Sequence, residues 1–409
     1  MKVIYLNKIN VLIIGNGHYS TGSTVLEGKK ETNTDFGVIL PAVLELKNQG
    51  YVDKIYLAAK NGYKFNNLED KIKLLNEKFG WDTSIEFFPN KNEVNEEAYL
   101  EALKALPKPG AVIISTPNHL HKEMMMATID AGHHFMIVKP PLTKLKDYKE
   151  VINKLDHTNL LAMVDYHKIH DEPNLILREQ CSQNEYGQIQ HIFSKMTQRR
   201  DMLEIFGEWF GKETNVNHYI GSHYIHLTEF ITGAVPLDVR STCQYGLIEE
   251  EYEIKTPDLI ETQITWEKDG YKLSSYHIAG LSDPSETSAM THQEIQIIGT
   301  NGHVRSDQKN RGLYRVLDSK HPESINPNFF YINKDINGKV NLEGKYGFKS
   351  MKIFITSVLE IENGSDINRY EKMLPTLRNS KNIIAILDAA DVSISKGSSI
   401  IKLEDMEDY

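Results

Sequence analysis

The sequence predicts a two-domain α/β protein, with a doubly wound parallel sheet in residues 1–166 and an α+β domain in residues 167–409. The chain has 409 residues, which is more than one hydrophobic core usually organises. Its first part alternates apolar strand-like runs with amphipathic helical stretches, and this pattern is typical of a parallel sheet with helices on both faces. Between residues 239 and 316, strand-like stretches follow one another without helices, which favours a mostly antiparallel sheet.

The first domain is expected to contain six buried strands and the helices that connect them. The strands are expected at 10–15, 54–59, 84–88, 111–116, 134–138 and 160–166. The helices are expected at 41–49, 68–79, 95–106, 121–131 and 145–155. Pro41 suits a first helical turn, and Gly132 is a typical helix stop. Ligands of such sheets bind beyond the carboxyl ends of the strands, so the motifs at these ends are the first candidates for a functional site.

The second domain is expected to be a large, open, mostly antiparallel sheet flanked by helices. Its helices are expected at 174–183, 222–232, 349–361 and 380–394. Within the block 239–316, the clearest strands are expected at 261–267, 272–278 and 294–299. The segment 319–347 is rich in Pro, Asn and Gly and is interpreted as long loops. The open face of the sheet is a candidate oligomer interface.

Composition excludes several classes of function. The net charge of −10 argues against a nucleic-acid partner, because phosphate binding needs a basic face. The two cysteines, Cys181 and Cys243, lie far apart, which makes a disulfide framework or a structural zinc site unexpected and fits a reducing, cytoplasmic compartment. The apolar start of the chain is interpreted as a strand and not as a signal peptide. No stretch approaches the roughly 20 apolar residues of a membrane helix, so no membrane association is expected.

The first motif, Gly15-Asn16-Gly17, directly follows the first strand and precedes His18. Two glycines let the backbone turn tightly and approach a pyrophosphate, whose charge the next helix N-terminus favours. The full dinucleotide fingerprint has a third glycine where this chain has Ser20. A polar stretch follows Gly22 and lengthens the turn. The alternative interpretation is a glycine-rich turn with no ligand.

The second motif, Lys60-Asn61, closes the second strand. Sites that prefer NAD usually place a carboxylate here to bind the ribose 2′-hydroxyl, and this chain has none. Lys60 and Asn61 could instead bind the 2′-phosphate of NADP, although a solvated turn lysine explains the pattern equally well. The cofactor is therefore expected to be NAD or NADP, with a slight preference for NADP.

Two further motifs follow strands four and five. The motif after strand four is expected to contact the ribose or nicotinamide of the cofactor through Thr116, Pro117, Asn118 and His121. The alternative for Asn118 is a helix N-cap, which can coexist with ligand binding.

The dipeptide Lys139-Pro140 follows strand five. Pro140 restricts Lys139 to an extended conformation and so fixes the direction of its side chain. A lysine at this edge can hydrogen-bond a substrate hydroxyl and hold the negative charge that develops on its oxygen. The alternative is an exposed lysine beside a loop.

The fifth motif is the histidine-rich stretch 218–226. If it is an α-helix, Tyr219 and His223 lie at i and i+4 and share one face. Alcohol oxidation needs a base with a near-neutral pKa, and histidine matches that requirement best. A metal site formed by His218, His223 and His226 is the weaker alternative, because no carboxylate or cysteine completes it, and no metal is expected.

Taken together, the motifs resemble the glucose–fructose oxidoreductase / inositol dehydrogenase (Gfo/Idh/MocA) family. The order is that of the family: GNG after strand one, TPNHLH after strand four, KP after strand five, then YHK, GSHYI, GTNGHVRSD and a C-terminal LPTLRNSKNIIAILDAAD. The resemblance implies a Rossmann dinucleotide-binding domain and covers nearly the whole chain. It also implies a homodimer or homotetramer built on the second-domain sheet.

The resemblance assigns roles to particular residues. Lys139 matches the catalytic lysine of the family and His223 its catalytic histidine, while Tyr166, His167 and Lys168 would line the substrate and nicotinamide. Tyr219 stands where the family has an aspartate, and Val138 and His226 also depart from its pattern. Tyr219 could substitute as a hydroxyl donor in catalysis and substrate binding. The alternative is that the acid–base task falls on Lys139 and His223 alone.

The function predicted from these residues is an NAD(P)-dependent oxidoreductase, which transfers a hydride between nicotinamide and a hydroxyl carbon of a sugar, sugar derivative or cyclitol. One alternative is a glycosidase or lyase that oxidises its sugar transiently and recycles a tightly bound dinucleotide. The other is a non-catalytic dinucleotide-binding sensor. The substrate and the direction of the reaction stay open.

Overall fold

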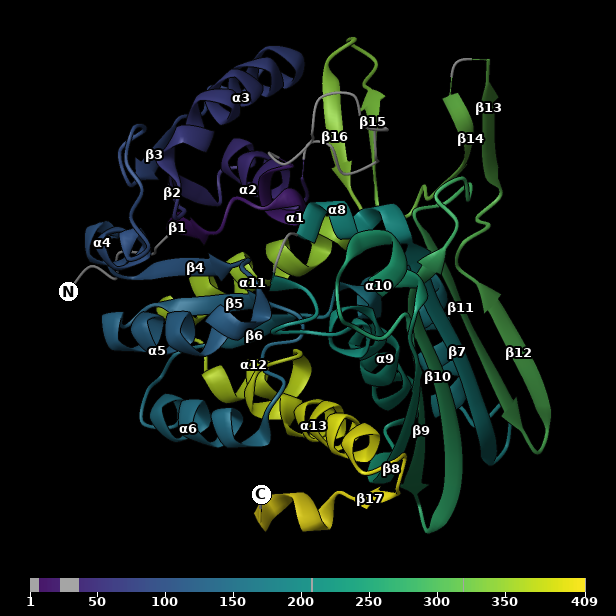
Figure 1. The fold of residues 1–409 in the computed structure, drawn as a ribbon. Coiled ribbons are helices and arrows are strands. Elements are labelled where there is room, and N and C mark those ends of the chain that lie inside the picture. The colour runs from purple at the N-terminus through teal and green to yellow at the C-terminus, as the bar shows by residue number, and fades with distance from the viewer. Residues whose placement is uncertain (1–6, 23–36, 207–208, 319, 409) are drawn as a thin grey trace. The chain divides into compact units, whose positions relative to one another are not determined.

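The computed structural model describes residues 7–22, 37–206, 209–318 and 320–408 (Figure 1). The chain forms two compact units, and each is described by itself. The first unit comprises Met1–Pro141, Lys149–His167 and Phe329–Asn379, and the second comprises Leu142–Tyr148, Lys168–Asn328 and Ser380–Tyr409.

The first unit contains the predicted parallel sheet. Its six strands are arranged in the order β3-β2-β1-β4-β5-β6, and every neighbouring pair is parallel. The strands are β1 (Ile9–Ile14), β2 (Val52–Ala58), β3 (Ile85–Phe88), β4 (Gly110–Ile114), β5 (His134–Val138) and β6 (Ala162–Asp165). This is the strand order of the Rossmann fold, with the topological switch between β1 and β4. The predicted fold class of this part is confirmed.

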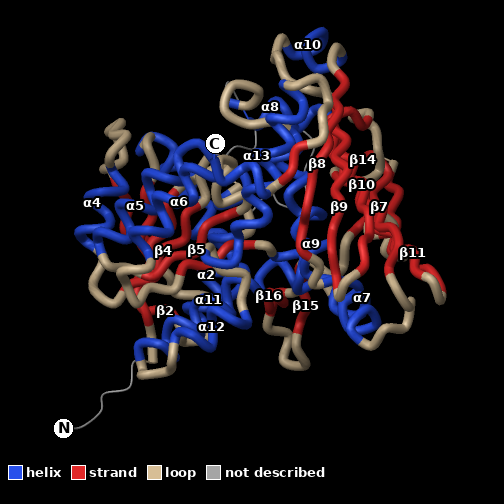
Figure 2. Tube along the Cα trace, turned by 90° about the horizontal axis from the view of Figure 1, so that it is seen from below, coloured by secondary structure: helices blue, strands red, loops and turns tan. Residues whose placement is uncertain are grey.

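Helices cover both faces of this sheet, with α2 and α11 on one side and α5 on the other (Figure 2). The helices of the first unit are α1 (His18–Thr21), α2 (Ile39–Asn48), α3 (Phe65–Phe79), α4 (Ala98–Ala105), α5 (His121–Ala131), α11 (Tyr346–Glu362) and α12 (Ile367–Met373). Helix α6 (Leu145–Leu155) begins in the second unit and continues in the first.

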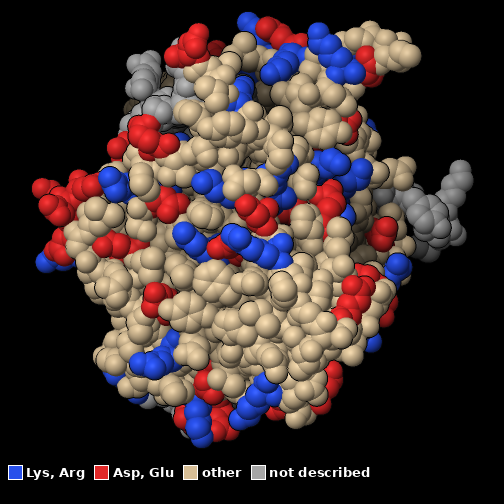
Figure 3. Space-filling model, turned by 90° about the vertical axis from the view of Figure 1, so that its right-hand side faces the viewer, with Lys and Arg blue, Asp and Glu red and all other residues tan. Residues whose placement is uncertain are grey.

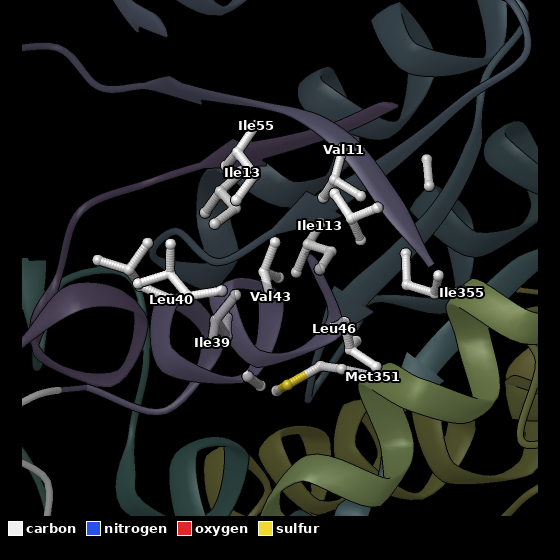
Figure 4. Packing of buried hydrophobic residues seen from close by; sticks show 14 of the residues in the cluster. Val11, Ile13, Ile39, Leu40, Val43, Leu46, Ile55, Ile113, Met351 and Ile355 are labelled. Carbon is white, nitrogen blue, oxygen red and sulfur yellow. The ribbon is translucent and has the colours of Figure 1, made fainter. Parts of the chain in front are cut away.

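A single hydrophobic cluster joins α2, α3 and α11 to the sheet. Figure 4 shows Met351 and Ile355 of α11 beside Leu46 of α2, and both α11 residues are completely buried. Each such side chain stabilises the fold by about 1.5–3 kcal/mol. Residues 329–379 therefore return to the first unit, although the sequence assigned them to the second domain. The predicted boundary at 166/167 lies one residue before the passage from His167 in the first unit to Lys168 in the second. The division into domains 1–166 and 167–409 stays a prediction.

The second unit is built on a seven-stranded sheet in the order β12-β11-β7-β10-β9-β8-β17. All neighbouring pairs are antiparallel except β7 and β10, so the predicted mostly antiparallel sheet is confirmed. The strands are β7 (Ile189–Arg199), β8 (Val235–Gln244), β9 (Leu259–Lys268), β10 (Tyr271–Asp283), β11 (Thr291–Gly299), β12 (Gly302–Asp307) and β17 (Ile401–Lys402). The helices are α7 (Glu172–Ser182), α8 (Leu203–Phe206), α9 (Ser222–Thr232), α10 (Leu247–Tyr252) and α13 (Lys381–Ser395).

The prediction that residues 319–347 form only long loops is wrong. Two antiparallel hairpins occupy most of this region, formed by β13 (Leu313–Leu317) with β14 (Lys320–Ile325) and by β15 (Phe330–Lys334) with β16 (Val340–Gly344). The turn between β15 and β16 contains Asn337 and Gly338, and Gly338 has φ +80°. In the described part of the chain, no helix combines the length and apolar character needed to cross a membrane.

Candidate functional site

The glycine-rich turn after β1 packs tightly against the end of β4. Gly15 has φ +107°, and a Cβ atom there would lie 2.1 Å from the carbonyl oxygen of Ser115. At Gly17, in contrast, no heavy atom of the described residues, apart from its chain neighbours, lies within 4 Å of where a Cβ would project. Thr21 closes the turn by donating its hydroxyl to the carbonyl of Asn16 at 3.0 Å. The backbone at Gly17 is thus open to close approach, which is the arrangement that a dinucleotide pyrophosphate requires.

The first Rossmann helix is split into α1 and α2. The amide of Val38 donates to the carbonyl of Tyr19 at 2.7 Å, which is the bond that residue 23 would make in a continuous helix. Gly37, at φ +71°, fits against the end of α1, where a Cβ would lie 2.6 Å from the carbonyl of Ser20. The ends of the polar insertion therefore meet. The insertion itself, residues 23–36, lies outside the described residues.

The end of β2 presents Lys60 and Asn61. The Lys60 ammonium pairs with Glu96, and both side chains are largely exposed, at 63% and 73%. The hydrogen bond from Lys60 lowers the pKa of Glu96. The side chain of Asn61 accepts from the amide of Tyr63 at 3.0 Å, and it thereby caps a short 3-10 turn. Lys60 is consequently accessible to an anion, whereas the oxygen of Asn61 is occupied locally.

His121, at the end of β4, bridges to the end of β5. It is 1% exposed. Its Nε2 lies 2.9 Å from the carbonyl of Thr116, and its Nδ1 lies 3.0 Å and 3.2 Å from the carbonyls of Pro140 and Pro141. Burial lowers the pKa of His121 to about 4, so the ring is neutral near pH 7. His121 is placed to hold these two loops together.

The other residues of this motif adopt a different local structure from the one expected. Asn118 does not cap α5: it begins a 3-10 turn, Asn118–Leu120, and neither that turn nor α5 has a side-chain N-cap. Pro117 precedes this turn, and Thr116 contacts the sulfur of Met124 through its hydroxyl at 3.3 Å. The Lys139–Pro140 peptide bond at the end of β5 is cis.

Tyr166, His167 and Lys168 follow β6. Tyr166 and Lys168 are 2% and 3% exposed, and the chain passes from the first unit to the second between His167 and Lys168. Lys168 contacts Gln293 and lies over the ring of Tyr224. Burial lowers the pKa of Lys168 to about 7, although the nearby Asp171 carboxylate opposes this effect.

In the second unit, the segment that carries Tyr219 and His223 is not a continuous α-helix. Asn217–Gly221 is a π-helical turn, and His223 lies in α9, so the α-helical i,i+4 argument for Tyr219 and His223 does not hold. Gly221 is closely packed here: a Cβ would lie 2.2 Å from the side-chain oxygen of Asn217 and 3.2 Å from the Cβ of Ala279 in β10. π-Helical turns are rare and often occur at functional sites.

Tyr219 lies among aromatic rings, 4.6 Å from the ring of Phe206 and 6.2 Å from that of Phe210. Burial raises its pKa to about 12, against the effect of a hydrogen bond with Gln198. Tyr219 therefore stays protonated near neutral pH and can act as a hydroxyl donor but not as a base. His223 is 6% exposed.

The histidines considered as metal ligands have other surroundings. His218 Nε2 lies 3.1 Å from a carboxylate oxygen of Asp391, which also accepts from Asn215 at 3.0 Å. Burial lowers the pKa of His226 to about 3, so that ring is neutral. Among the residues that the structure describes, no three His, Cys, Asp or Glu side chains are arranged to hold a metal ion.

Comparison with known proteins identifies the dinucleotide-binding part. Residues 51–166 match the family model GFO_IDH_MocA, described as an oxidoreductase family with an NAD-binding Rossmann fold. This part of the chain is therefore similar to the NAD-binding domain of the Gfo/Idh/MocA family. The match includes Lys60, His121 and Lys139, and it begins after the insertion that separates α1 from α2. The family resemblance of the motifs is confirmed.

One relative and several solved structures are also similar to this chain. Over 150 residues the chain is 28% identical to scyllo-inositol 2-dehydrogenase (NADP(+)) of Bacillus subtilis (strain 168), covering 36% of this chain and 40% of that protein. The matched region thus spans less than half of this curated relative. The structure of apo scyllo-inositol dehydrogenase from Lactobacillus casei covers 98% of this chain at 14% identity with a TM-score of 0.65. Myo-inositol 2-dehydrogenase from Lactobacillus plantarum covers 97% at 16% identity, also with a TM-score of 0.65. At these identities the structures show a shared fold.

Within the first unit, the structure brings part of the predicted site together. Gly15 lies against Ser115 and Thr116, and His121 links Thr116 to Pro140. The predicted catalytic pair is divided, since Lys139 belongs to the first unit and His223 to the second. Their convergence on one substrate carbon stays a prediction.

Sequence reasoning missed Tyr19, Asp165 and Asp391. Asp165 is the last residue of β6, and a carboxylate at the end of an apolar strand was a signal that could have been used. Tyr19 and Asp391 gave no such signal, because their partners are far away in the chain. Tyr19 contacts Asp165, 146 residues away, and Asp391 contacts His218, 173 residues away.

Proposed function

We propose that this protein is an NAD(P)-dependent dehydrogenase that transfers a hydride between nicotinamide and a hydroxyl carbon of a sugar, sugar derivative or cyclitol. The observation that carries the proposal is the match of residues 51–166 to an NAD-binding oxidoreductase family. The open backbone at Gly17 and the tight packing of Gly15 against Ser115 support a dinucleotide at the carboxyl ends of β1 and β4.

Lys60 supports NADP as the preferred dinucleotide. No carboxylate of the Ala58-Ala59-Lys60-Asn61 segment is available for a ribose 2′-hydroxyl, and Lys60 is exposed at the end of β2. Glu96 would have to release Lys60 when the 2′-phosphate binds. The Bacillus subtilis relative carries NADP(+) in its name.

Calorimetric titration with NAD and NADP tests this preference. Lys60→Ala should weaken NADP binding about 10-fold, the loss of about 1.4 kcal/mol expected when one exposed phosphate contact is removed, and leave NAD binding unchanged. Lys91→Ala is the matched control, because Lys91 also pairs with a partly exposed glutamate, Glu69. Equal NADP affinity in the Lys60 variant and the wild type would contradict the role of Lys60.

The proposed chemistry divides the work between two side chains. A bound nicotinamide dinucleotide supplies the hydride acceptor or donor. The Lys139 ammonium would hydrogen-bond the reacting hydroxyl and stabilise negative charge on its oxygen, and the His223 imidazole would accept its proton. Tyr219, which stays neutral, would donate a hydrogen bond to the substrate.

The most direct test of these roles is Lys139→Ala. We expect kcat to fall about 10²–10⁴-fold, the range for a positioned acid, base or oxyanion group, while the Kd of the dinucleotide changes little. Lys146→Ala, an exposed lysine on α6, is the control and should behave like the wild type. Unchanged turnover of the Lys139 variant would exclude the assignment.

Cyclitols are the first substrates to test. Several structures with this fold are titled as inositol dehydrogenases, and one of them, from Lactobacillus casei, has bound NAD(H) and scyllo-inositol. A panel of scyllo-inositol, myo-inositol, aldoses and sugar acids should be assayed in both directions by the absorbance of the reduced dinucleotide. If the dinucleotide binds but no member of the panel reacts, the non-catalytic alternative, motivated by Tyr219 in place of an aspartate, gains support.

The open face of the seven-stranded sheet is our candidate for a homodimer or homotetramer interface. Helices α9 and α13 lie against β7, β8 and β10 on one side. The other side is seen in Figure 3, where acidic and basic side chains are interspersed among uncharged ones. On the strands of this sheet, Phe193 of β7 and Tyr276 of β10 stack at 6.5 Å and are partly exposed. Phe193→Glu should shift the mass measured by light scattering to a smaller species; an unchanged mass would contradict this interface.

A further inference from the structure

Three polar side chains from two distant segments meet in the first unit. Tyr19 comes from α1, directly after the glycine-rich turn, and Asp165 and His167 come from the end of β6. The Tyr19 hydroxyl lies 3.0 Å from Oδ2 of Asp165 and 3.2 Å from Nδ1 of His167. Nδ1 of His167 lies 3.8 Å from the same carboxylate oxygen. The hydroxyl of Tyr19 thus bridges a carboxylate and an imidazole.

Packing fixes the orientation of the His167 ring. It stacks on Tyr19 at 6.2 Å and on Tyr346 at 5.7 Å, each with an interplanar angle of 21°. Phe329 meets it edge-on at 6.1 Å. Asp165 is 1% exposed, whereas 11% of the His167 side chain stays accessible. The ring is held firmly, and part of it can still be reached from outside.

The hydrogen bonds select one tautomer of this imidazole. An ionised carboxylate only accepts hydrogen bonds, so the single proton of the Tyr19 hydroxyl is donated to Asp165. The Tyr19 oxygen then accepts from Nδ1–H of His167. Although burial opposes it, hydrogen bonds from His167, Ser350 and Tyr19 hold the pKa of Asp165 below its ordinary value, so the carboxylate is ionised. Neutral His167 therefore carries its proton on Nδ1, and Nε2 is the basic nitrogen.

We propose that His167, rather than His223, accepts the proton of the substrate hydroxyl, and that Asp165 and Tyr19 are positioning residues that hold His167 in the Nδ1–H tautomer. This inference rests on the proposed dehydrogenase function. When the C–H bond breaks, its hydride passes to the oxidised nicotinamide, the O–H bond gives its proton to Nε2, and the carbon–oxygen bond becomes a carbonyl. The imidazolium formed is stabilised by Asp165 through Tyr19 and later releases its proton to water.

The contacts among Tyr19, Asp165 and His167 link the glycine-rich turn to the end of β6. Tyr19 is two residues from Gly17, where the backbone is open to the dinucleotide, and His167 lies beyond the last strand of the sheet. Among the described contacts of the His167 ring, the titratable groups are Asp165, Tyr19 and Tyr346, and Asp165 is the carboxylate. Its charge is therefore what should set the basicity of the ring.

The first test is made on the dinucleotide-free protein by ¹⁵N NMR of labelled histidines, with His167 assigned by His167→Gln. We expect the Nδ1–H tautomer in the wild type. Asp165→Asn should lower the Nδ1–H fraction of His167, because the amide that replaces the carboxylate no longer fixes the direction of the Tyr19 hydroxyl proton. Tyr19→Phe, which keeps the stacked ring, should shift this fraction in the same direction. An Nε2–H tautomer in the wild type would overturn the inference, whether or not the variants fold.

The second test is the pH profile of turnover with the polyol that the panel identifies. A base must be deprotonated to act, so in Asp165→Asn and Tyr19→Phe the acidic limb of kcat should move to lower pH by about one unit and kcat should fall about 10–100-fold. Tyr99→Phe is the control, because it removes a tyrosine–carboxylate hydrogen bond, to Glu123, elsewhere in this unit. Variants that lose stability but keep the wild-type limb would show a merely structural role and overturn the inference. Failure of the proposed function itself is distinguishable, because the wild type would then turn over no polyol while the tautomer stayed measurable.

Discussion

Alanine substitutions of the two glycines in the turn after β1 are expected to have opposite effects on stability and on dinucleotide binding. Gly15 has φ +107° and a Cβ would lie 2.1 Å from the backbone oxygen of Ser115. Gly17 has φ −69°, and in the part of the chain that the structure describes no heavy atom beyond its chain neighbours lies within 4 Å of where its Cβ would be. Gly15→Ala therefore perturbs the protein itself, whereas Gly17→Ala perturbs only what approaches the turn.

The size of each effect follows from this geometry. A side chain at positive φ costs about 1–2 kcal/mol, and forcing a methyl group into a packed site costs about 1–3 kcal/mol more. The β1 and β4 ends would have to separate by about 1 Å, since atoms in contact need more than 3 Å. We expect Gly15→Ala to lower the free energy of unfolding by about 2–5 kcal/mol and Gly17→Ala to change it by less than about 0.5 kcal/mol.

Urea unfolding and calorimetric titration with the preferred dinucleotide measure the two effects separately. Gly17→Ala should unfold like the wild type yet bind the dinucleotide at least about 10-fold more weakly, because its methyl group occupies the approach of the pyrophosphate. Gly50→Ala is the control for backbone strain: it has φ +86° and open space, and it precedes β2 at the opposite edge of the sheet. It should lose about 1–2 kcal/mol of stability without loss of affinity.

Two results would refute this reasoning. If Gly17→Ala binds with wild-type affinity, the phosphates do not approach the turn there. If Gly15→Ala is as stable as the wild type, the close approach of the turn to Ser115 is not a property of the protein in solution.

Three further predictions concern stability. Met351→Ala should lower the free energy of unfolding by about 2–5 kcal/mol, because α11 covers the sheet with this buried side chain. For the same reason, a fragment that ends at residue 166 should show no cooperative thermal transition. A stable fragment would contradict the assignment of residues 329–379 to the first unit. Arg311→Met should lower the free energy of unfolding by about 3–5 kcal/mol, because it leaves the fully buried Asp171 carboxylate without its ion pair. The double variant Arg311→Met with Asp171→Leu should recover most of this loss. No recovery would show that the ion pair is not the cause. Burial lowers the pKa of His277 to about 3. Below pH 6.5 the unfolded chain therefore binds more protons than the folded chain. The free energy of unfolding contributed above that pH should fall by about 1.4 kcal/mol per pH unit as the pH drops toward 4. His277→Gln should remove that share of the slope in melting temperature against pH, and an unchanged slope would contradict it.

Local patterns predicted the first unit well. The strands at 134–138 and the helix at 121–131 coincide with β5 and α5, because an apolar run of strand length and a Gly132 stop leave little choice. The expected ends of the strands also located Gly15, Lys60 and Lys139 correctly, just after β1, β2 and β5. Periodicity could not predict that α11 packs beside Leu46, since it reports that a face is buried and not what covers it.

The chemistry of the site was predicted less completely. Histidine spacing in the 218–226 stretch assumed an α-helix, and the π-helical turn at Asn217–Gly221 depends on the packing of Gly221 against Ala279 of another strand. His121 was expected to touch the cofactor, but its buried ring faces carbonyl groups of two loops. The bridge between Tyr19 and Asp165 joins residues 146 positions apart, which no local pattern encodes.

The transfer of an isotope tests the central claim most directly. The protein is incubated with oxidised dinucleotide and a polyol deuterated at its hydroxyl-bearing carbons, and the dinucleotide is recovered for mass spectrometry. The account predicts one deuterium in the reduced nicotinamide with the wild type and almost none with Lys139→Ala. A dinucleotide that binds tightly but stays unlabelled with every polyol of the panel would contradict it.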